Sequence, residues 1–162
     1  MIANSTMKVT TPSDKEIVVT REFNAPRQMV WDAMTKPEFL KRWMFGPPGW
    51  ELAVCEDSGE AGGNFRYVWN QGGVPAMTMS GVNKEVVAPE RCVRTERFEF
   101  GCAPQAGEQH ATMVLVENGG KTIMTLTLVY PSKEARDRAV ASGMEQGMAM
   151  GYNRLDDILA GR

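Results

Sequence analysis

Few residues in this sequence are suited to acid–base chemistry, and the best placed of them share one predicted strand. The segment RTERFEF carries Glu96 and Glu99. A carboxylate whose pKa is raised by an apolar cavity is a suitable proton acceptor, and Arg66, Arg94 or Arg97 is a suitable ion-pair partner. Either glutamate would serve as a general base if its strand turned it inward, which is the chemistry of a cyclase or dehydratase.

Other residue types that mark catalysis or metal binding are scarce. His110 is the single histidine, and it follows the polar segment APQAGEQ at the start of a predicted strand, which is typical of a surface residue. The chain contains no HExxH, GxSxG, Walker or GxGxxG motif. Its cysteines, Cys55, Cys92 and Cys102, are odd in number and lack CxxC spacing. We interpret them as small buried or neutral positions, and we expect no metal and no cofactor.

Binding of apolar surface is better represented than catalysis. The segment RWMFGPPGWE, residues 42–51, places Trp43, Phe45 and Trp50 around a Gly-Pro-Pro-Gly turn. Loops usually face water and are polar, so this turn is either covered by the protein or free to cover something else. It could form the mouth of a pocket, or it could close one end of the fold as part of the core.

Two further features favour an apolar pocket. In GNFRYVWN, the side chains of Phe65, Tyr67 and Trp69 point to one face of a strand and form an aromatic wall. The chain also has 12 methionines, which fill irregular volumes and adapt to variable partners, although a loosely specified core would use them equally well. The predicted pocket residues are Trp43, Phe45, Trp50, Phe65, Tyr67, Trp69, Met77, Met79, Met144, Gly147 and Met148.

Glycines recur every four residues near the C-terminus, at Gly143, Gly147 and Gly151. Inside a helix each costs about 1 kcal/mol relative to alanine, so something must offset the penalty. One interpretation is close packing of the helix backbone against a neighbouring element. The other is that the missing side chains leave room for a ligand, and only this second interpretation predicts that Gly147→Leu folds well while losing the ligand.

The elements that would position these residues follow a simple order. Residues 1–14 are aperiodic and predict a mobile tail before a single domain of residues 15–162. The segment KEIVVTREF predicts a strand and PRQMVWDAMT a short helix, while a capping-box spacing from Thr35 to Glu38 predicts a second short helix. Six more strands are predicted at residues 50–57, 63–70, 76–87, 91–100, 110–117 and 121–130.

The last segment predicts one long amphipathic helix, from the N-cap Ser132 to a stop at Gly161. Its predicted apolar face consists of Val140, Met144, Met148, Gly151, Leu155, Ile158 and Leu159. This order of elements predicts an α+β fold in which a seven-stranded curved antiparallel sheet wraps around the C-terminal helix, with two short helices after the first strand.

Four phrases in this order resemble a known family. The phrases are REFNAPRQMVWDAMTKPEFLKRWMFGPPGW, GGNFRY, SGVNKEVVAPERCVRTERF and SGMEQGMAMGYNRLDDIL. They are similar to bacterial single-domain relatives of the activator of heat-shock protein 90 ATPase, within the START-like (SRPBCC) helix-grip superfamily. The chain departs from that family's tandem Trp-Trp-Gly-Pro, since it reads Trp43-Met44-Phe45-Gly46-Pro47. The resemblance implies a cavity between the long helix and the sheet, which in the superfamily often receives apolar or amphipathic small molecules.

Composition limits the partners. With 18 Lys+Arg against 20 Asp+Glu and no basic run, the chain is not expected to bind nucleic acid. No stretch reaches the ~18 apolar residues of a membrane span, and the N-terminus lacks the regions of a signal peptide, so we expect a cytoplasmic protein. The apolar segment from Trp43 to Trp50 could be buried in a homodimer.

Three functions remain open from the sequence. The favoured one is a small-molecule binding protein that holds an apolar or amphipathic ligand between the C-terminal helix and the sheet. The second is a cyclase or dehydratase that uses a pocket carboxylate. The third, implied by the resemblance, is a stress-related chaperone cofactor that binds another protein. The fold alone does not choose among them, because related folds host many activities.

Overall fold

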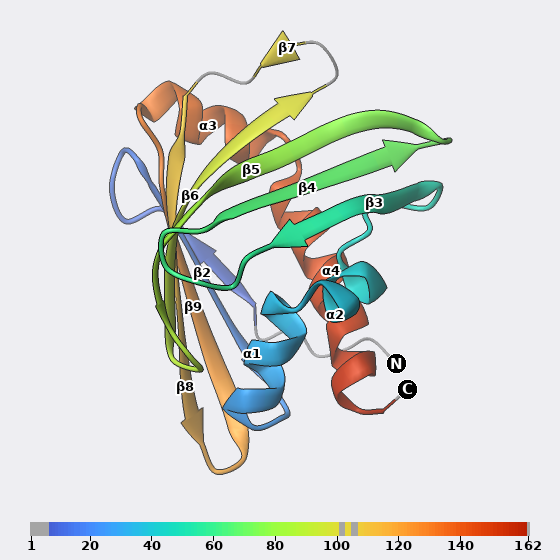
Figure 1. Cartoon of the computed structure of the whole chain (residues 1–162). Helices are drawn as coiled ribbons and strands as arrows, with labels where there is room; N and C mark the ends of the chain where they lie inside the picture. The colour runs from blue at the N-terminus through green and yellow to red at the C-terminus, as the bar shows by residue number, and fades with distance from the viewer. Residues whose placement is uncertain (1–6, 101–102, 105–106, 162) are drawn as a thin grey trace.

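One antiparallel sheet organises the protein in the computed structural model, which describes residues 7–100, 103–104 and 107–161 (Figure 1). The strands run in the spatial order β1-β2-β9-β8-β6-β5-β4-β3, and β7 pairs with β6 beside this path. Their bounds are β1 Lys8–Thr10, β2 Glu16–Phe23, β3 Trp50–Asp57, β4 Asn64–Gln71, β5 Val74–Val87, β6 Arg91–Phe100, β7 Ala103–Pro104, β8 Gln109–Asn118 and β9 Lys121–Val129.

The predicted α+β helix-grip fold is confirmed, and all seven predicted strands lie within two residues of their expected bounds. The sheet gains a further edge strand from the segment predicted as a mobile tail. There, Val9 of β1 lies opposite Val19 of β2, and its side chain packs against the core. Residues 1–6 of the predicted tail lie outside the described part of the chain.

Side-chain alternation gives the sheet an apolar concave face. In β2, Ile17, Val19 and Phe23 are fully buried, and the intervening residues are less buried. Strands with this period of two place every second side chain on one face. Arg21 also belongs to the buried set, so a charge lies on the apolar face and requires a partner.

Two short helices follow β2, namely α1 (Arg27–Thr35) and α2 (Pro37–Trp43). The predicted capping box between them is wrong, because the N-cap of α2 is Lys36 and it makes no side-chain cap. The hydroxyl of Thr35 instead donates a 2.7 Å hydrogen bond to the carbonyl of Trp31 in its own helix. Pro37 supplies the start of α2, where a missing N–H group costs little.

The predicted long C-terminal helix is two helices, α3 (Lys133–Ala141) and α4 (Met144–Leu159). Gly143 adopts φ +85°, a left-handed conformation that glycine accepts readily and that interrupts a helix. Ser132 caps α3 as predicted, because its hydroxyl accepts a 3.1 Å hydrogen bond from the amide of Ala135. Val140 is 49% exposed on α3, so it does not belong to the apolar face of α4.

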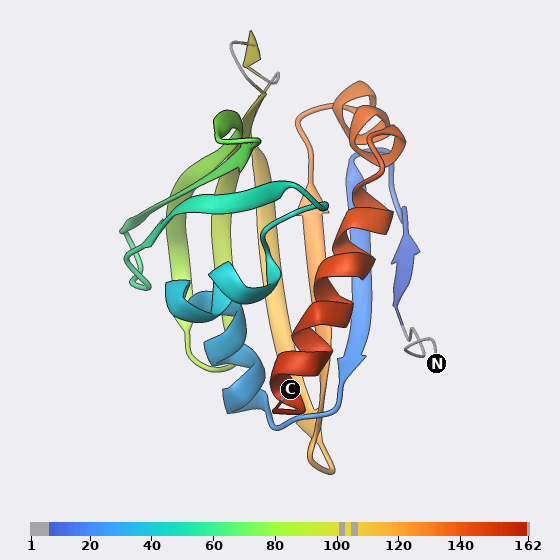
Figure 2. The ribbon, with the colours of Figure 1, turned by 90° about the vertical axis from the view of Figure 1, so that its right-hand side faces the viewer.

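Helix α4 lies across the concave face of the sheet, in front of β2 and β9, while α1 and α2 cover the neighbouring part of that face (Figure 2). Gly151, Tyr152 and Leu155 form its buried side. Of the helices described, none is both long and apolar enough to cross a membrane. Side chains of β4, β6 and β8, which are distant from one another in the sequence, meet on the concave face of the sheet.

Candidate functional site

Five polar side chains meet on the concave face of the sheet. We call this set the interior polar cluster: Asp57 of β3, Tyr67 of β4, Arg94 of β6, Glu96 of β6 and Gln109 of β8. Apolar faces of this kind usually exclude charge unless it is paired. The contacts within the cluster show how each charge is compensated.

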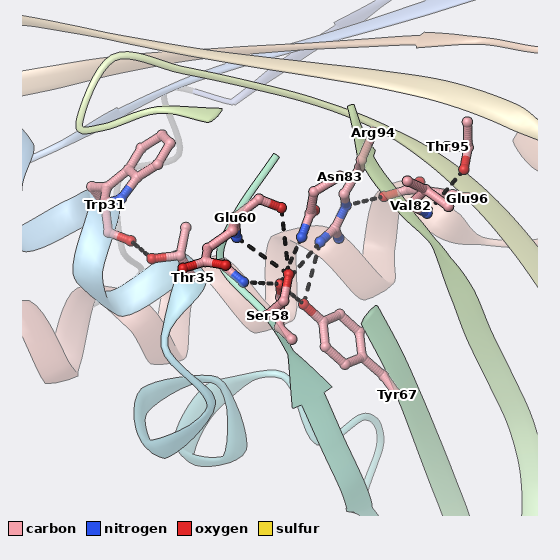
Figure 3. A network of polar contacts seen from close by, with 12 residues as sticks. Trp31, Thr35, Ser58, Glu60, Tyr67, Val82, Asn83, Arg94, Thr95 and Glu96 are labelled. Atoms are coloured by element: carbon pink, nitrogen blue, oxygen red, sulfur yellow. Dashed lines mark hydrogen bonds and ion pairs between the residues drawn. The ribbon is translucent and has the colours of Figure 1, made fainter. Parts of the chain in front are cut away.

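Arg94 is the centre of the interior polar cluster (Figure 3). Its Nε donates a 3.1 Å hydrogen bond to Oε2 of Glu96, and its Nη1 donates a 3.2 Å hydrogen bond to the hydroxyl of Tyr67. The guanidinium carbon also lies 4.0 Å from the ring centroid of Phe65, which adds a cation–π contact. Its side chain is 20% exposed, so these contacts hold the guanidinium in a largely covered position.

The two carboxylates lie on either side of Arg94. Asp57 accepts hydrogen bonds of 2.7 Å from the Tyr67 hydroxyl and 2.9 Å from Nδ2 of Asn83, and its Oδ2 lies 3.6 Å from Nη1 of Arg94. Glu96 accepts a second hydrogen bond, of 2.9 Å, from Nε2 of Gln109. One guanidinium faces two carboxylates, so the interior polar cluster carries an excess of negative charge when all three groups are ionised.

Two more tyrosines, Tyr130 after β9 and Tyr152 on α4, complete the polar surface of the interior. Both are only 6% exposed, and neither hydroxyl has a hydrogen-bond partner among the described residues. Burial is the largest cause that raises the pKa of each phenol, and the negative charge of Glu96 raises it further. At Tyr152 the positive charge of Arg21 acts in the opposite direction and outweighs Glu96. Glu96 is thus the charged group whose field reaches both hydroxyls.

Burial also shifts the pKa values of neighbouring groups. The pKa of Tyr67 is raised first by burial, with a smaller contribution from Asp57, although Arg94 acts in the opposite direction. Burial alone would lower the pKa of Arg94, but Tyr67 and Glu96 raise it above its ordinary value. Burial raises the pKa of Cys55 to about 11. The cluster therefore contains a permanent cation, and Cys55 remains a neutral thiol at physiological pH.

Apolar side chains beside the interior polar cluster are only partly covered. Met113 and Leu126 are cross-strand neighbours on the central strands β8 and β9, and Cys92 lies opposite Met113 on β6. All three are half-buried and pack against the core, as does Met148 of α4. Inward-facing residues of central strands are normally sealed, so these side chains are less completely covered than is usual on such a face.

The family described as activator of Hsp90 ATPase homolog 1-like protein has a model that matches residues 24–160. The chain belongs to this family. No curated protein gives a significant match to the sequence.

Solved structures agree with membership of the activator of Hsp90 ATPase homolog 1-like family. A crystal structure of a protein from Rhodobacter sphaeroides is 28% identical, covers 96% of this chain and 99% of that one, and has a TM-score of 0.89. A solution structure from Arthrobacter aurescens is 25% identical, with coverage of 96% and 92% and a TM-score of 0.82. One from Staphylococcus epidermidis is 27% identical, with coverage of 96% and 94% and a TM-score of 0.77.

In this family member, two of the predicted pocket tryptophans lie in the core: Trp43, expected at the mouth, and Trp69, expected in the aromatic wall. Trp43 is buried, and its Nε1 donates a 2.8 Å hydrogen bond to the carbonyl of Ala33 in α1. Trp69 is also buried, and its Nε1 donates a 2.7 Å hydrogen bond to the carbonyl of Met44. These bonds fix the aromatic turn to α1 and β4, so much of it closes one end of the fold.

The rest of the aromatic turn is less covered. Phe45 and Trp50 are half-buried and pack against the core. The guanidinium carbon of Arg154 on α4 lies 3.8 Å from the ring centroid of Phe45, and its Nη1 donates a 3.4 Å hydrogen bond to the carbonyl of Trp43. The turn is therefore attached to α4 as well as to the sheet.

The other predicted aromatic and methionine pocket residues come from both the sheet and α4. Phe65, Tyr67 and Met79 are buried, and Tyr67 enters the interior polar cluster. Three more of the predicted residues, Met77, Met144 and Met148, are half-buried around the core. The structure thus brings these six predicted residues to the apolar interior, whereas Gly147 is exposed. Their role as ligand contacts stays a prediction.

The two glycines within α4 differ in their surroundings. A Cβ at Gly151 would lie 3.4 Å from Cε3 of Trp43, so close approach to the aromatic turn explains this position. Apart from the backbone of its own helix, a Cβ at Gly147 would meet no atom of the described residues within 4 Å, so close packing does not explain that one. Gly143 lies between α3 and α4, at the N-cap of α4, and is not inside either helix.

The two glutamates predicted as candidate bases lie in different environments. Glu96 is buried in the interior polar cluster and pairs with Arg94, whereas Glu99 is exposed. His110 is exposed, as predicted. Cys92 is half-buried, and Cys102 lies outside the described residues. Among the residues described, no three His, Cys, Asp or Glu side chains are grouped so that they could hold a metal ion.

Sequence analysis missed Tyr130, Tyr152, Asp57 and Gln109 as interior polar residues. Tyr152 lies four residues after Met148 and three before Leu155, which is the spacing of one helix face. Tyr130 continues the alternation of Leu126 and Leu128 along β9. Both tyrosines were therefore identifiable from periodicity alone.

A separate hollow of about 440 Å³ lies on strands β3 to β5. Its lining consists of Glu56, Asn64, Phe65, Arg66, Ser80 and Gly81. Three of these residues, Glu56, Arg66 and Ser80, are neighbours across the strands and belong to the face opposite Tyr67. This hollow is distinct from the interior polar cluster.

Proposed function

We propose that this protein binds a small amphipathic molecule between α4 and the concave face of the sheet. The observation that carries the proposal is the coexistence of half-buried apolar side chains and incompletely used polar groups in one interior. Met113 and Leu126 provide apolar surface on the sheet, and Met148 packs against the same core from α4. Ligand sites commonly combine apolar walls with a few polar groups that orient the ligand.

Membership of the activator of Hsp90 ATPase homolog 1-like family supports ligand binding only in general terms, and the interior residues supply the specific argument. A cyclase or dehydratase that used Glu96 as a base would need the same space for its substrate. Binding is therefore the first property to establish for either function. A role as a chaperone cofactor would instead depend on the outer surface.

Native mass spectrometry of the purified protein tests the proposal. We expect a bound compound that is released on denaturation, and an increase in melting temperature with members of a panel of fatty acids, sterols and aromatic molecules. Failure of every panel member to raise the melting temperature, together with a native mass equal to that of the bare chain, would contradict the proposal.

A matched pair of variants locates the binding space. Met113→Trp places a larger side chain on the concave face, whereas Thr112→Trp makes the same change on the opposite face of β8. We expect Met113→Trp to lose the ligand and Thr112→Trp to keep it. Circular dichroism and melting temperature establish that both variants are folded. Retention of ligand by a folded Met113→Trp variant would place the ligand elsewhere.

A further inference from the structure

The polar side of the interior indicates which class of ligand fits, and this inference rests on the proposed function. Each carboxylate oxygen has more than one lone pair. In Glu96, Oε2 receives one hydrogen bond from Arg94 and Oε1 receives one from Gln109. Glu96 therefore retains acceptor capacity on the side that is not occupied by these donors.

The two interior phenols provide an independent observation. Tyr130 and Tyr152 are nine-tenths buried, yet their hydroxyls have no hydrogen-bond partner among the residues described. Neither hydroxyl oxygen is among the fully buried side-chain atoms that lack a partner, so both oxygens reach space that is open to a ligand. Tyr67 shows the contrasting case, because its hydroxyl both donates to Asp57 and accepts from Arg94.

Charge then distinguishes between ligand classes. Asp57 and Glu96 together outweigh Arg94, so an added carboxylate would enter a region that already has an excess of negative charge. An added ammonium group would offset that excess and could donate to Glu96. Gln109 lies opposite Glu96, and the register of β8 and β9 continues to place Tyr130 opposite Gln109, while Tyr152 reaches the same concave face from α4. The hydroxyl oxygens of both tyrosines accept hydrogen bonds from the same kind of group.

We propose that the interior binds a ligand whose polar end is a protonated amine, held by Glu96 and by the hydroxyls of Tyr130 and Tyr152. The apolar part of the ligand lies against Met113, Leu126 and Met148. Neutral alcohols bind more weakly than the amine, and carboxylates bind most weakly.

Three probes of the same shape test this order: 4-phenylbutylamine, 4-phenylbutanol and 4-phenylbutanoate. At neutral pH the amine is cationic and the carboxylate anionic. Isothermal titration calorimetry is expected to give a dissociation constant about tenfold lower for the amine than for the carboxylate, with the alcohol between them. Equal or tighter binding of the carboxylate would overturn the inference while leaving the proposed function intact.

Variants of the named side chains test whether they bind the amine group of the ligand. Tyr130→Phe and Tyr152→Phe are each expected to weaken binding of 4-phenylbutylamine about fivefold or more without lowering the melting temperature of the free protein. Glu96→Gln is expected to remove the preference for the amine, whereas Glu99→Gln, an exposed position on the same strand, keeps it. Unchanged amine affinity in both tyrosine variants would overturn the inference even if Glu96→Gln failed to fold.

The failure of all three probes to bind would also overturn the inference. Native mass spectrometry would then decide the proposed function separately, because a co-purified compound is detected whatever its charge. A bound compound that carries a carboxylate and no amine would contradict the charge argument alone. Absence of any compound and of any panel response would contradict both proposals.

Discussion

Arg21 on β2 and Asp156 on α4 form a two-pronged ion pair that fixes the C-terminal helix across the sheet. Nη2 of Arg21 lies 2.6 Å from Oδ2 of Asp156, and Nη1 lies 2.9 Å from Oδ1. The same guanidinium donates a 3.1 Å hydrogen bond to the side chain of Asn153. Because Arg21 is only 2% exposed, its charge depends on these contacts for compensation.

Asp156→Asn should therefore destabilise the protein. We expect a loss of about 3 kcal/mol in the free energy of unfolding, since the change leaves a buried guanidinium without its counter-charge. Urea unfolding followed by circular dichroism measures it. Glu85→Gln is the matched control, because Glu85 and its partner Arg91 form an exposed pair and such pairs contribute about 1 kcal/mol or less. Equal losses in the two variants would contradict the role assigned to Arg21 and Asp156.

The hydroxyl of Tyr67 should be important for stability. Tyr67→Phe removes a donor from the buried carboxylate of Asp57 and an acceptor from Arg94. We expect the free energy of unfolding to fall by about 1–3 kcal/mol, because buried polar groups that lose a partner are costly. Tyr152→Phe removes no hydrogen bond and should not destabilise the protein. Chemical denaturation of both variants compares them directly, and a stable Tyr67→Phe variant would contradict the account of the interior polar cluster.

The glycines of α4 should respond differently to a large side chain. Gly151→Leu would drive side-chain atoms into Trp43, because a Cβ at this position already lies 3.4 Å from that ring. Overpacking of this kind costs about 1–3 kcal/mol. Gly147→Leu meets open space and should remain as stable as the parent or become more stable. Thermal unfolding distinguishes the two, and a large loss in Gly147→Leu would restore close packing as the explanation for that glycine.

The thiol of Cys55 should be unreactive at moderately alkaline pH. Burial raises its pKa from 9.0 to about 11, so at pH 8 the reactive thiolate should be about 100-fold less abundant than for an ordinary cysteine. Alkylation by iodoacetamide, read by peptide mass spectrometry, should accelerate as the pH rises toward 11. Because the folded pKa lies above the unfolded one, the associated stability is present below pH 9 and is lost as the pH rises through about 11. Rapid alkylation of folded protein at pH 8 would contradict the burial of this thiol.

The fold was largely predictable because alternation and turn residues act locally. The β-branched and aromatic strands and the glycine-containing turns gave the order of elements without knowledge of their packing. The errors have a local cause as well. Gly143 fits a helical repeat in the sequence, but its positive φ makes it the boundary between α3 and α4.

The interior polar cluster was only partly predictable. Alternation along β6 puts Arg94 and Glu96 on one face and Arg97 on the other, which identifies the ion pair but not which face is buried. Asp57 was out of reach, because the register shifts between Leu52 and Val54 of β3. A bulge of this kind changes which side chains face inward after it, and the sequence carries no clear sign of its position.

The central claim is that a small molecule occupies the space between α4 and the sheet, and methionine methyl NMR tests it most directly. With methionine methyl groups labelled, titration with 4-phenylbutylamine should shift the signals of the interior residues Met113 and Met148. The exposed residues Met29 and Met150 should keep their signals unchanged. Shifts confined to Met29 and Met150, or no shift of any methionine signal at saturating probe, would contradict the claim.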